Sequence, residues 1–179
     1  TYNGKPVTGI GWNAFKNNTT ITRITIPESI ERIDDTSFKG CTNLTSITLP
    51  QYSKLDYWSN PFRNMPGDVF ENASITYYER DDGTLKITGA IGRVKEGETL
   101  VIPKYINGKK VVAVRRGVFQ GCAGVKKVEL ADGFKTVGRG MFIDARELEE
   151  VILPDNIDIL ESCLFANCKK LNKINIGQN

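Results

Sequence analysis

One pattern of apolar residues returns along this chain at a fixed spacing. Five phenylalanines mark it, and neighbours within two groups are 23 residues apart: Phe15 and Phe38, then Phe119, Phe142 and Phe165. Around each phenylalanine, the positions at offsets −8, −5, +6, +9 and +11 are also apolar, which makes thirty apolar positions in all. A repeat of this length predicts stacked, equivalent turns of chain, each contacting its neighbours, rather than one globular core.

Each repeat, called a rung from here on, contains a short extended stretch, a turn that carries the phenylalanine, and a strand. Prolines close the strands of three rungs, at Pro27, Pro50 and Pro154, as expected because proline is confined to strand ends and edges. Asp34 and Asp35 precede Phe38 and are typical helix N-cap residues. We therefore expect an α/β repeat solenoid of the leucine-rich type. It would be a right-handed coil with a parallel β-sheet on the concave side and short helical or 3-10 turns opposite.

The repeat is interrupted in the middle of the chain. Phe38 and Phe119 are 81 residues apart, which is not a multiple of 23. Regular rungs form a first block at about 1–50 and a second block at about 104–177. The stretch at about 51–103 contains a disrupted rung (52–73) followed by two predicted strands, 74–80 and 84–88. An Asp-Gly turn at 82–83 joins these strands. We interpret residues 1–179 as a single solenoid with an irregular spacer; whether its sheet runs through the spacer stays open.

A longer repeat overlies the rungs. The segment Asn3-Gly4-Lys5-Pro6-Val7 returns 104 residues later as Asn107-Gly108-Lys109-Lys110-Val111. The strand that precedes the second copy has no counterpart before the first, and the chain begins at Thr1 without methionine. We therefore expect this sequence to be a fragment of a longer protein.

Composition argues against several classes of function. The formal net charge is +3 and no Lys/Arg run exceeds two residues, so a nucleic-acid footprint is not supported. No apolar stretch approaches the length of a membrane span. The chain has no histidine, no C-x-x-C and no phosphate-binding glycine motif, which excludes Ser-His-Asp triads and His-based zinc sites. We expect no enzyme, no cofactor and no metal.

The four cysteines do not form a pattern typical of disulfides. Cys41, Cys122 and Cys168 each follow a repeat phenylalanine by three residues, where other rungs carry Asn18 or Ala145. Equivalent positions two rungs apart are about 10 Å from each other, too far for a disulfide bond. We expect free buried thiols; Cys163 and Cys168 are the one pair for which a bond is arguable.

Short motifs resemble the BspA-type leucine-rich repeats of bacterial surface proteins. The motifs are Ile10-Gly11, Ala14-Phe15, Thr25-Ile26-Pro27, Gly40-Cys41 and Asn43-Leu44 in the first block, and Gly121-Cys122, Ile152-Leu153-Pro154 and Asn167-Cys168 in the second. The resemblance covers about three quarters of the chain. It implies a secreted or cell-surface, non-catalytic module for adhesion or host interaction, and it does not identify a ligand.

Two sets of residues are candidates for a binding surface. Seven of the sixteen aromatic residues lie between 52 and 78, and aromatic side chains are favoured anchors in interfaces; the alternative is that they fill the core of the disrupted rung. The outward strand positions form ladders of charged residues; the alternative to ligand contact is that their alternating signs only keep like charges apart. The candidates are Tyr52, Tyr57, Trp58 and Phe62 from the aromatic set, and Arg23, Lys127, Glu150 and Lys173 from the ladders.

These observations lead to one functional hypothesis and one alternative. The hypothesis is a monomeric module of an exported bacterial surface protein that binds a protein or glycan, including ligands on a host surface. The alternative is a structural spacer that presents other domains of the full-length protein.

Overall fold

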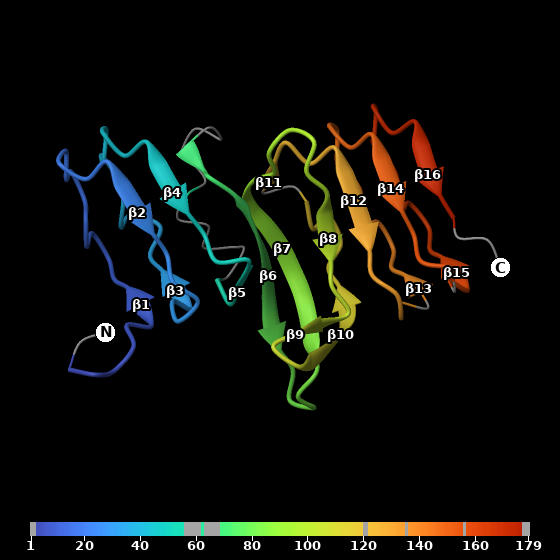
Figure 1. Cartoon of the computed structure of the whole chain (residues 1–179), viewed down its shortest axis with the longest axis horizontal. Helices are drawn as coiled ribbons and strands as arrows, with labels where there is room; N and C mark the ends of the chain where they lie inside the picture. The colour runs from blue at the N-terminus through green and yellow to red at the C-terminus, as the bar shows by residue number, and fades with distance from the viewer. Residues whose placement is uncertain are drawn as a thin grey trace.

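The chain folds into a row of short strands stacked along one long axis, with its ends at opposite extremes (Figure 1). The computed structural model describes residues 3–55, 62, 69–119, 122–134, 136–155 and 157–176. These residues form strands and turns; among them, only Val69 lies in a 3-10 helical turn and none lies in an α-helix. The strands stack across the molecule because each rung returns to the same place one sheet spacing further along.

The first block contains two rows of parallel strands. In each row the paired residues are 23 positions apart, as in Arg23 with Ser46 and Gly9 with Arg32. An isolated parallel bridge pairs Ile47 with Phe70, another 23 residues on, so the disrupted rung keeps the repeat. The strands of the two rows are β2 (Arg23–Thr25) with β4 (Ser46–Thr48), and β1 (Gly9–Ile10) with β3 (Arg32–Ile33).

The second block repeats this arrangement. Its main sheet is parallel and four-stranded, and the pairs Val128–Val151 and Val151–Ile174 again have the 23-residue offset. The predicted strands and their parallel pairing are therefore confirmed. The main sheet runs in the order β16 (Lys173–Asn175), β14 (Glu150–Ile152), β12 (Lys127–Leu130) and β8 (Leu100–Ile102), and the second row pairs β13 (Thr136–Val137) with β15 (Ile159–Leu160).

A six-stranded mixed sheet lies between the two blocks. Its centre is the predicted hairpin, in which β6 and β7 are antiparallel, while β5, β10 and β11 join it by parallel pairing. The hairpin prediction is confirmed, although β7 runs five residues further than 84–88, to Arg93. The strands are β5 (Tyr52–Ser53), β6 (Ala73–Glu79), β7 (Leu85–Arg93), β10 (Lys109–Val114), β9 (Tyr105–Ile106) and β11 (Cys122–Ala123).

The expected helical segments around the repeat phenylalanines are not found; turns occupy these positions. In the last complete rung, Cys163 and Asn167, two residues before and after Phe165, have φ of 57° and 63°. A left-handed residue on both sides of the phenylalanine prevents helical continuation. The backbone groups bond between rungs instead, as in Phe142 N–H to the Leu164 carbonyl at 3.1 Å. Asp34 accepts hydrogen bonds from the N–H and hydroxyl of Thr36, so it forms a local turn rather than a helix cap.

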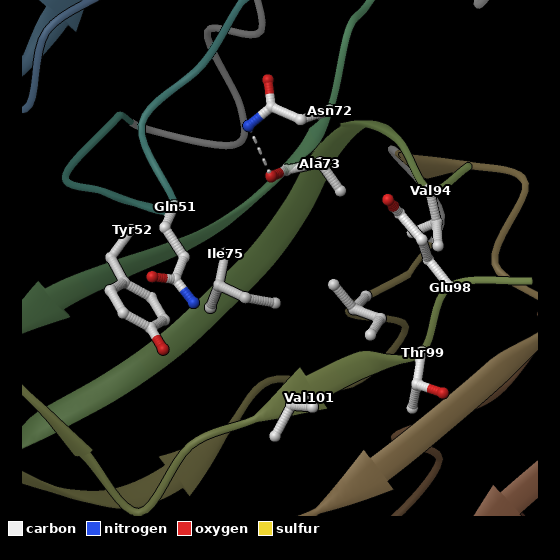
Figure 2. A pocket seen from close by; sticks show the side chains of 10 residues that line it. Gln51, Tyr52, Asn72, Ala73, Ile75, Val94, Glu98, Thr99 and Val101 are labelled. Carbon is white, nitrogen blue, oxygen red and sulfur yellow. Dashed lines mark hydrogen bonds between the residues drawn. The ribbon is translucent and has the colours of Figure 1, made fainter.

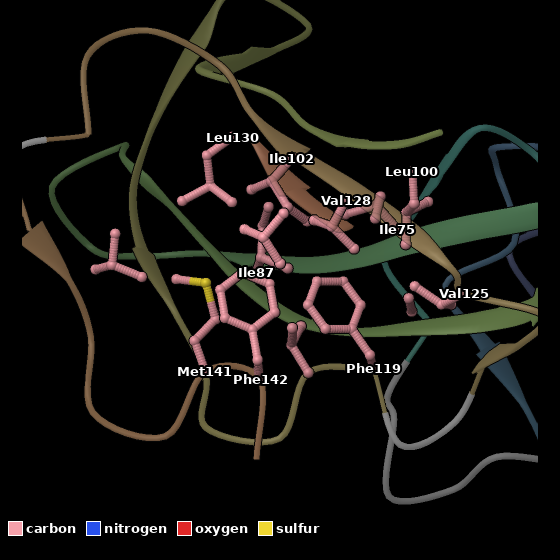
Figure 3. Packing of buried hydrophobic residues seen from close by; sticks show 14 of the residues in the cluster. Ile75, Ile87, Leu100, Ile102, Phe119, Val125, Val128, Leu130, Met141 and Phe142 are labelled. Atoms are coloured by element: carbon pink, nitrogen blue, oxygen red, sulfur yellow. The ribbon is translucent and has the colours of Figure 1, made fainter. Parts of the chain in front are cut away.

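The phenylalanines stack into columns inside the molecule. Successive rings have centroids 5.2–5.7 Å apart, close to the rung spacing. Figure 3 shows Phe119 and Phe142 packed together with apolar side chains of the surrounding strands. The stacks are Phe15–Phe38–Phe62 in the first block and Phe119–Phe142–Phe165 in the second.

The buried residues form two clusters, and the hairpin separates them. The cluster of the second block includes Ile75, Leu85 and Ile87 from β6 and β7. The cluster of the first block includes Phe70 and, from the same hairpin, Ile91. The β6–β7 hairpin therefore supplies side chains to both cores.

The four cysteines are free, as expected. Burial differs among them: Cys41 is buried, whereas Cys163 is exposed, which corrects the expectation of four buried thiols. The thiols of Cys41 and Cys168 each donate a hydrogen bond to the carbonyl of the phenylalanine one rung earlier, at 3.0 and 2.9 Å.

Candidate functional site: a pocket at the junction of the two blocks

A pocket of about 220 Å³ lies where the first block meets the second. Strands β5 and β6 form one wall, and the segment from the end of β7 into β8 forms the other (Figure 2). The pocket is lined by Gln51, Tyr52, Asn72, Ala73, Ile75, Val94, Glu98, Thr99, Leu100 and Val101.

Two glycines allow the walls of this junction to come together. Gly92 has φ of +87°, and a Cβ atom there would lie 2.4 Å from the Asn72 carbonyl oxygen. Gly124 has φ of +73°, and its Cβ would lie 2.4 Å from the Val94 carbonyl oxygen. Any side chain at these positions would force the neighbouring backbone apart, so the pocket depends on glycine at both.

Asn72 holds the wall of the pocket but does not offer its side chain to a ligand. Its amide donates to the Leu49 carbonyl at 2.8 Å. It also donates to the Ala73 carbonyl at 3.2 Å, the bond drawn in Figure 2. Its carbonyl oxygen accepts the Leu49 N–H at 2.9 Å. Leu49 lies 23 residues before Asn72, so this amide connects two adjacent rungs.

Three polar side chains of the pocket keep unused hydrogen-bonding groups. Within the described part of the chain, Gln51, Tyr52 and Thr99 make no side-chain hydrogen bond. Burial raises the pKa of Tyr52 above its ordinary value, so its hydroxyl stays protonated at neutral pH and can donate. Glu98 accepts the Lys95 N–H at 3.2 Å through one carboxylate oxygen. Apolar side chains supply the rest of the wall, a combination typical of small-ligand sites.

The aromatic candidates separate into different environments. Tyr52 is half-buried and lines the pocket. Phe62 is only 3% exposed, stacks on Phe38 and meets Phe70 edge-on at 5.5 Å. The prediction that Phe62 is a surface anchor is therefore wrong. Phe62 takes the place of the next repeat phenylalanine and fills the core of the disrupted rung, as the alternative interpretation had it. Tyr57 and Trp58 lie outside the described residues.

The charged candidates do not gather around the pocket. Glu150 lies between two lysines of the second block, 3.4 Å from Lys127 Nζ and 2.9 Å from Lys173 Nζ. The hydrogen bond from Lys173 is the main reason that the pKa of Glu150 lies below its ordinary value. Both lysines share the single carboxylate of Glu150, so this ladder pairs its alternating charges internally and keeps a formal charge of +1. Arg23 lies exposed on β2 of the first block and is not part of it.

Sequence comparison identifies the family. The profile of the BspA type leucine rich repeat region matches residues 8–89 and 98–179 in six copies. The chain belongs to the BspA-type leucine-rich repeat family. Among functionally curated proteins, a sequence comparison finds no match.

Two solved structures are similar to this BspA-type chain. One, a leucine rich cell surface protein from Faecalibacterium prausnitzii A2-165, is 18% identical with a TM-score of 0.32, over 95% of this chain and 51% of that one. The other, a leucine-rich repeat protein from Bacteroides ovatus ATCC 8483, is 21% identical with a TM-score of 0.42, over 96% of this chain and 41% of that one. The BspA-type chain thus spans about half the length of these proteins or less.

Two further features of this BspA-type chain bear on its chemistry. Within the described residues, no three His, Cys, Asp or Glu side chains are grouped so that they could hold a metal ion. No helix in that part of the chain is long and apolar enough to cross a membrane.

The polar pocket residues Gln51 and Thr99 did not stand out in the sequence. Nothing in their type or spacing marks them, and they lie 48 positions apart. The available signal was indirect: both flank the region where the 23-residue period fails, and a break in a stacked repeat is where neighbouring rungs stop filling the space between them.

Proposed function

We propose that this chain is a non-catalytic binding module of an exported bacterial surface protein, which holds a protein or glycan at the junction pocket. The observation that carries the proposal is the pocket itself, a concave site with Tyr52 and other unengaged polar groups at the break in the repeat. Regular rungs present flat, mutually paired surfaces, such as the ladder around Glu150. The break is where a ligand can enter between side chains.

The size of the pocket limits what can enter it. A volume of about 220 Å³ is smaller than the 300–1,000 Å³ of typical drug-sized sites. It suits one residue-sized group, either a single sugar ring of a glycan or one side chain of a partner protein. The remainder of the ligand would lie on the surface outside.

The chemistry of the wall supports either group. The ring of Tyr52 offers an apolar face beside Ile75 and Val101, and its hydroxyl can donate a hydrogen bond. Gln51 and Thr99 add both donors and acceptors. Groups that combine an apolar face with polar atoms, such as pyranose rings and tyrosine side chains, fit this mixture.

Export and surface display follow from the family resemblance and need a separate test. In the bacterium that produces the protein, an antibody against this chain should label intact cells or the culture medium. Labelling only after lysis would contradict this part of the proposal.

The binding role is tested with the wild-type chain on a glycan array and a panel of purified extracellular host proteins. For the ligand found, Tyr52→Ala should weaken binding about tenfold or more, as expected of a half-buried aromatic anchor. Trp12→Ala is the matched control, because Trp12 is an exposed aromatic residue of the first block and is not part of the pocket. Equal affinities of wild type and Tyr52→Ala for every ligand would exclude the pocket.

The internally paired ladder of Lys127, Glu150 and Lys173 favours a second candidate function, the structural spacer. A sheet whose lysines and glutamates are already paired has little charge left for a partner. A spacer would bind nothing in either screen, and replacing it by an unrelated rigid domain of similar length would preserve the activity of the full-length protein. Loss of adhesion after that replacement would contradict the spacer.

A further inference from the structure

Near the turn of the hairpin, the central sheet has an outward face that neither core uses; farther along β7, Ile91 belongs to the core of the first block. Side chains alternate across a strand, so the buried positions Leu85 and Val111, 1% and 3% exposed, identify the inward set. Tyr78 pairs with Lys86, and Lys110 directly precedes Val111. Tyr78, Lys86 and Lys110 therefore belong to the opposite face, at the end of the central sheet where the hairpin turns (Figure 1).

Two tyrosines on this face are strongly exposed. Tyr78 is 47% exposed and Tyr105, which pairs with Lys110 across β9 and β10, is 52% exposed. Val112, in the irregularity of β10, is 41% exposed. The Lys104 ammonium lies 5.6 Å from the centroid of the Tyr105 ring. The face thus combines exposed aromatic rings with cations.

The positive charge of this face is not compensated within the described chain. Lys86, Lys104 and Lys110 have no ion-pair partner among the described residues. The nearest carboxylate on these strands, Glu79, has inward parity and pairs with Lys109, also of inward parity. Because the Lys109–Glu79 pair lies on the inward face, it does not compensate the charges of the three lysines on the outward face.

In the part of the chain that the structure describes, neither carboxylate of the hairpin turn, Asp81 or Asp82, forms an ion pair with these lysines. Asp82 accepts hydrogen bonds from the N–H and hydroxyl of Thr84, which are the main cause of its lowered pKa. Arg80 is close enough to contribute to the same lowering. The carboxylate of Asp82 is thus held by hydrogen bonds within its own turn.

We infer that this aromatic, basic face of β6, β7, β10 and β9 binds an anionic polysaccharide. Lys86 on β7, Lys110 on β10 and Lys104 just before β9 form separate point charges. Such charges suit carboxylates repeated along a polymer better than one planar group, for which arginine is favoured. The exposed phenol rings of Tyr78 and Tyr105 present apolar faces on which pyranose rings can stack. A peptide added to the sheet would need a free strand edge, and the edge strand β9 is only two residues long.

The face is separate from the junction pocket, since none of its residues lines that pocket. The two sites can therefore fail independently. Tyr52→Ala should leave polysaccharide binding unchanged, and the variants below should leave binding at the junction pocket unchanged.

The test uses the full chain and polygalacturonate as the probe, with dextran as the neutral polysaccharide and poly-glutamate as the acidic peptide. Wild type should bind polygalacturonate, bind dextran at least about tenfold more weakly, and lose affinity several-fold between about 50 and 200 mM salt. Lys86→Glu with Lys110→Glu should weaken binding about tenfold or more. Tyr78→Ala and Tyr105→Ala should each weaken it about threefold or more, because a stacking contact is lost.

The matched control is Lys16→Glu with Lys39→Glu, which makes the same change of charge at exposed lysines of the first block. An equal loss in this control would show that only net charge matters, and would overturn the proposal. Binding of poly-glutamate as tight as that of polygalacturonate, with no effect of either tyrosine, would assign the face to acidic protein segments instead. Failure of folded wild type to bind polygalacturonate at low salt would also overturn it.

Discussion

At the scale of single residues, the corners of the rungs are set by residues that accept a left-handed backbone. Asn13, Gly117, Gly140 and Cys163 occupy the same place two residues before the repeat phenylalanine, with φ between 57° and 63°. Glycine and asparagine adopt this conformation at little cost, whereas cysteine does not. Cys163 therefore carries local strain, and its exposed thiol offers no packing in return.

Replacing Cys163 by glycine should raise the free energy of unfolding by about 0.5–1 kcal/mol. The left-handed penalty of cysteine exceeds the extra entropy that glycine gains in the unfolded chain. Urea unfolding followed by circular dichroism measures the change. Cys163→Ala is the control, since it removes the thiol and keeps the strained Cβ; a gain as large in Cys163→Ala would show that the backbone is not the cause.

The other corner position of the rung, three residues after the repeat phenylalanine, holds Cys41 and Cys168. The Cys41 thiol donates a hydrogen bond to the Phe15 carbonyl, and the Cys168 thiol donates one to the Phe142 carbonyl, each 26 residues earlier. A small donor at this place satisfies a carbonyl between rungs. Cys41 and Cys168 are thus part of the stacking of the rungs, and all four cysteines are free.

At the scale of secondary-structure elements, β7 connects the two blocks. It pairs with β6 on one side and with β10 and β11 on the other. Its closest backbone approach is at Gly92, where a Cβ would also lie 2.9 Å from Leu49 Cδ1. The contact between the blocks is therefore sensitive to a single methyl group.

Gly92→Ala should destabilise the protein by about 3 kcal/mol or more, because the new methyl group adds a collision with backbone to the left-handed penalty. Gly97→Ala is a matched control: Gly97 also has positive φ, of +81°, but has nothing within 4 Å of its Cβ position. It should cost only about 1–2 kcal/mol. Thermal and urea unfolding of both variants measure the difference, and equal costs would contradict the close approach at Gly92.

At the scale of the whole molecule, the apolar side chains form two clusters rather than one continuous core. In a stacked repeat each rung is stabilised mainly by its neighbours. The hairpin of β6 and β7 contributes to both clusters, so it couples them, but the two stacks of phenylalanine remain distinct. Local stability can therefore differ between the blocks.

Phe142→Ala should cost about 3–5 kcal/mol, because a fully buried ring between two stacked rings is removed. Hydrogen exchange should become faster in β12 to β16 and change much less in β2 and β4, since coupling is between neighbouring rungs. Phe38→Ala is the mirror-image control, with the larger effect in the first block. Uniform acceleration along the chain in either variant would contradict two separable clusters.

The sequence alone determined the period and most of the inward positions. Of the thirty apolar positions, Val7, Leu160, Ile174 and Ile176 in the outermost rungs are 40% or more exposed. The period and the inward positions depend on contacts between equivalent residues 23 positions apart. The same contact recurs between each pair of neighbouring rungs, so it appears in the sequence as a repeated pattern. Asp82-Gly83 likewise predicted the hairpin, because a tight turn between two strands depends only on the residues of the turn itself. For the same reason the family could be recognised from short motifs.

Only the tertiary structure decided what lies at the break and between the rungs. Phe62 is core because it stacks on Phe38, although its sequence context does not separate it from a surface aromatic. The turns replace helices because backbone groups find partners one rung away, and no single rung contains that information. The pocket joins Gln51 to Thr99, and the basic face joins Tyr78 to Tyr105. These sites depend on how an unrepeated stretch packs, and a contact that occurs once leaves no pattern in the sequence.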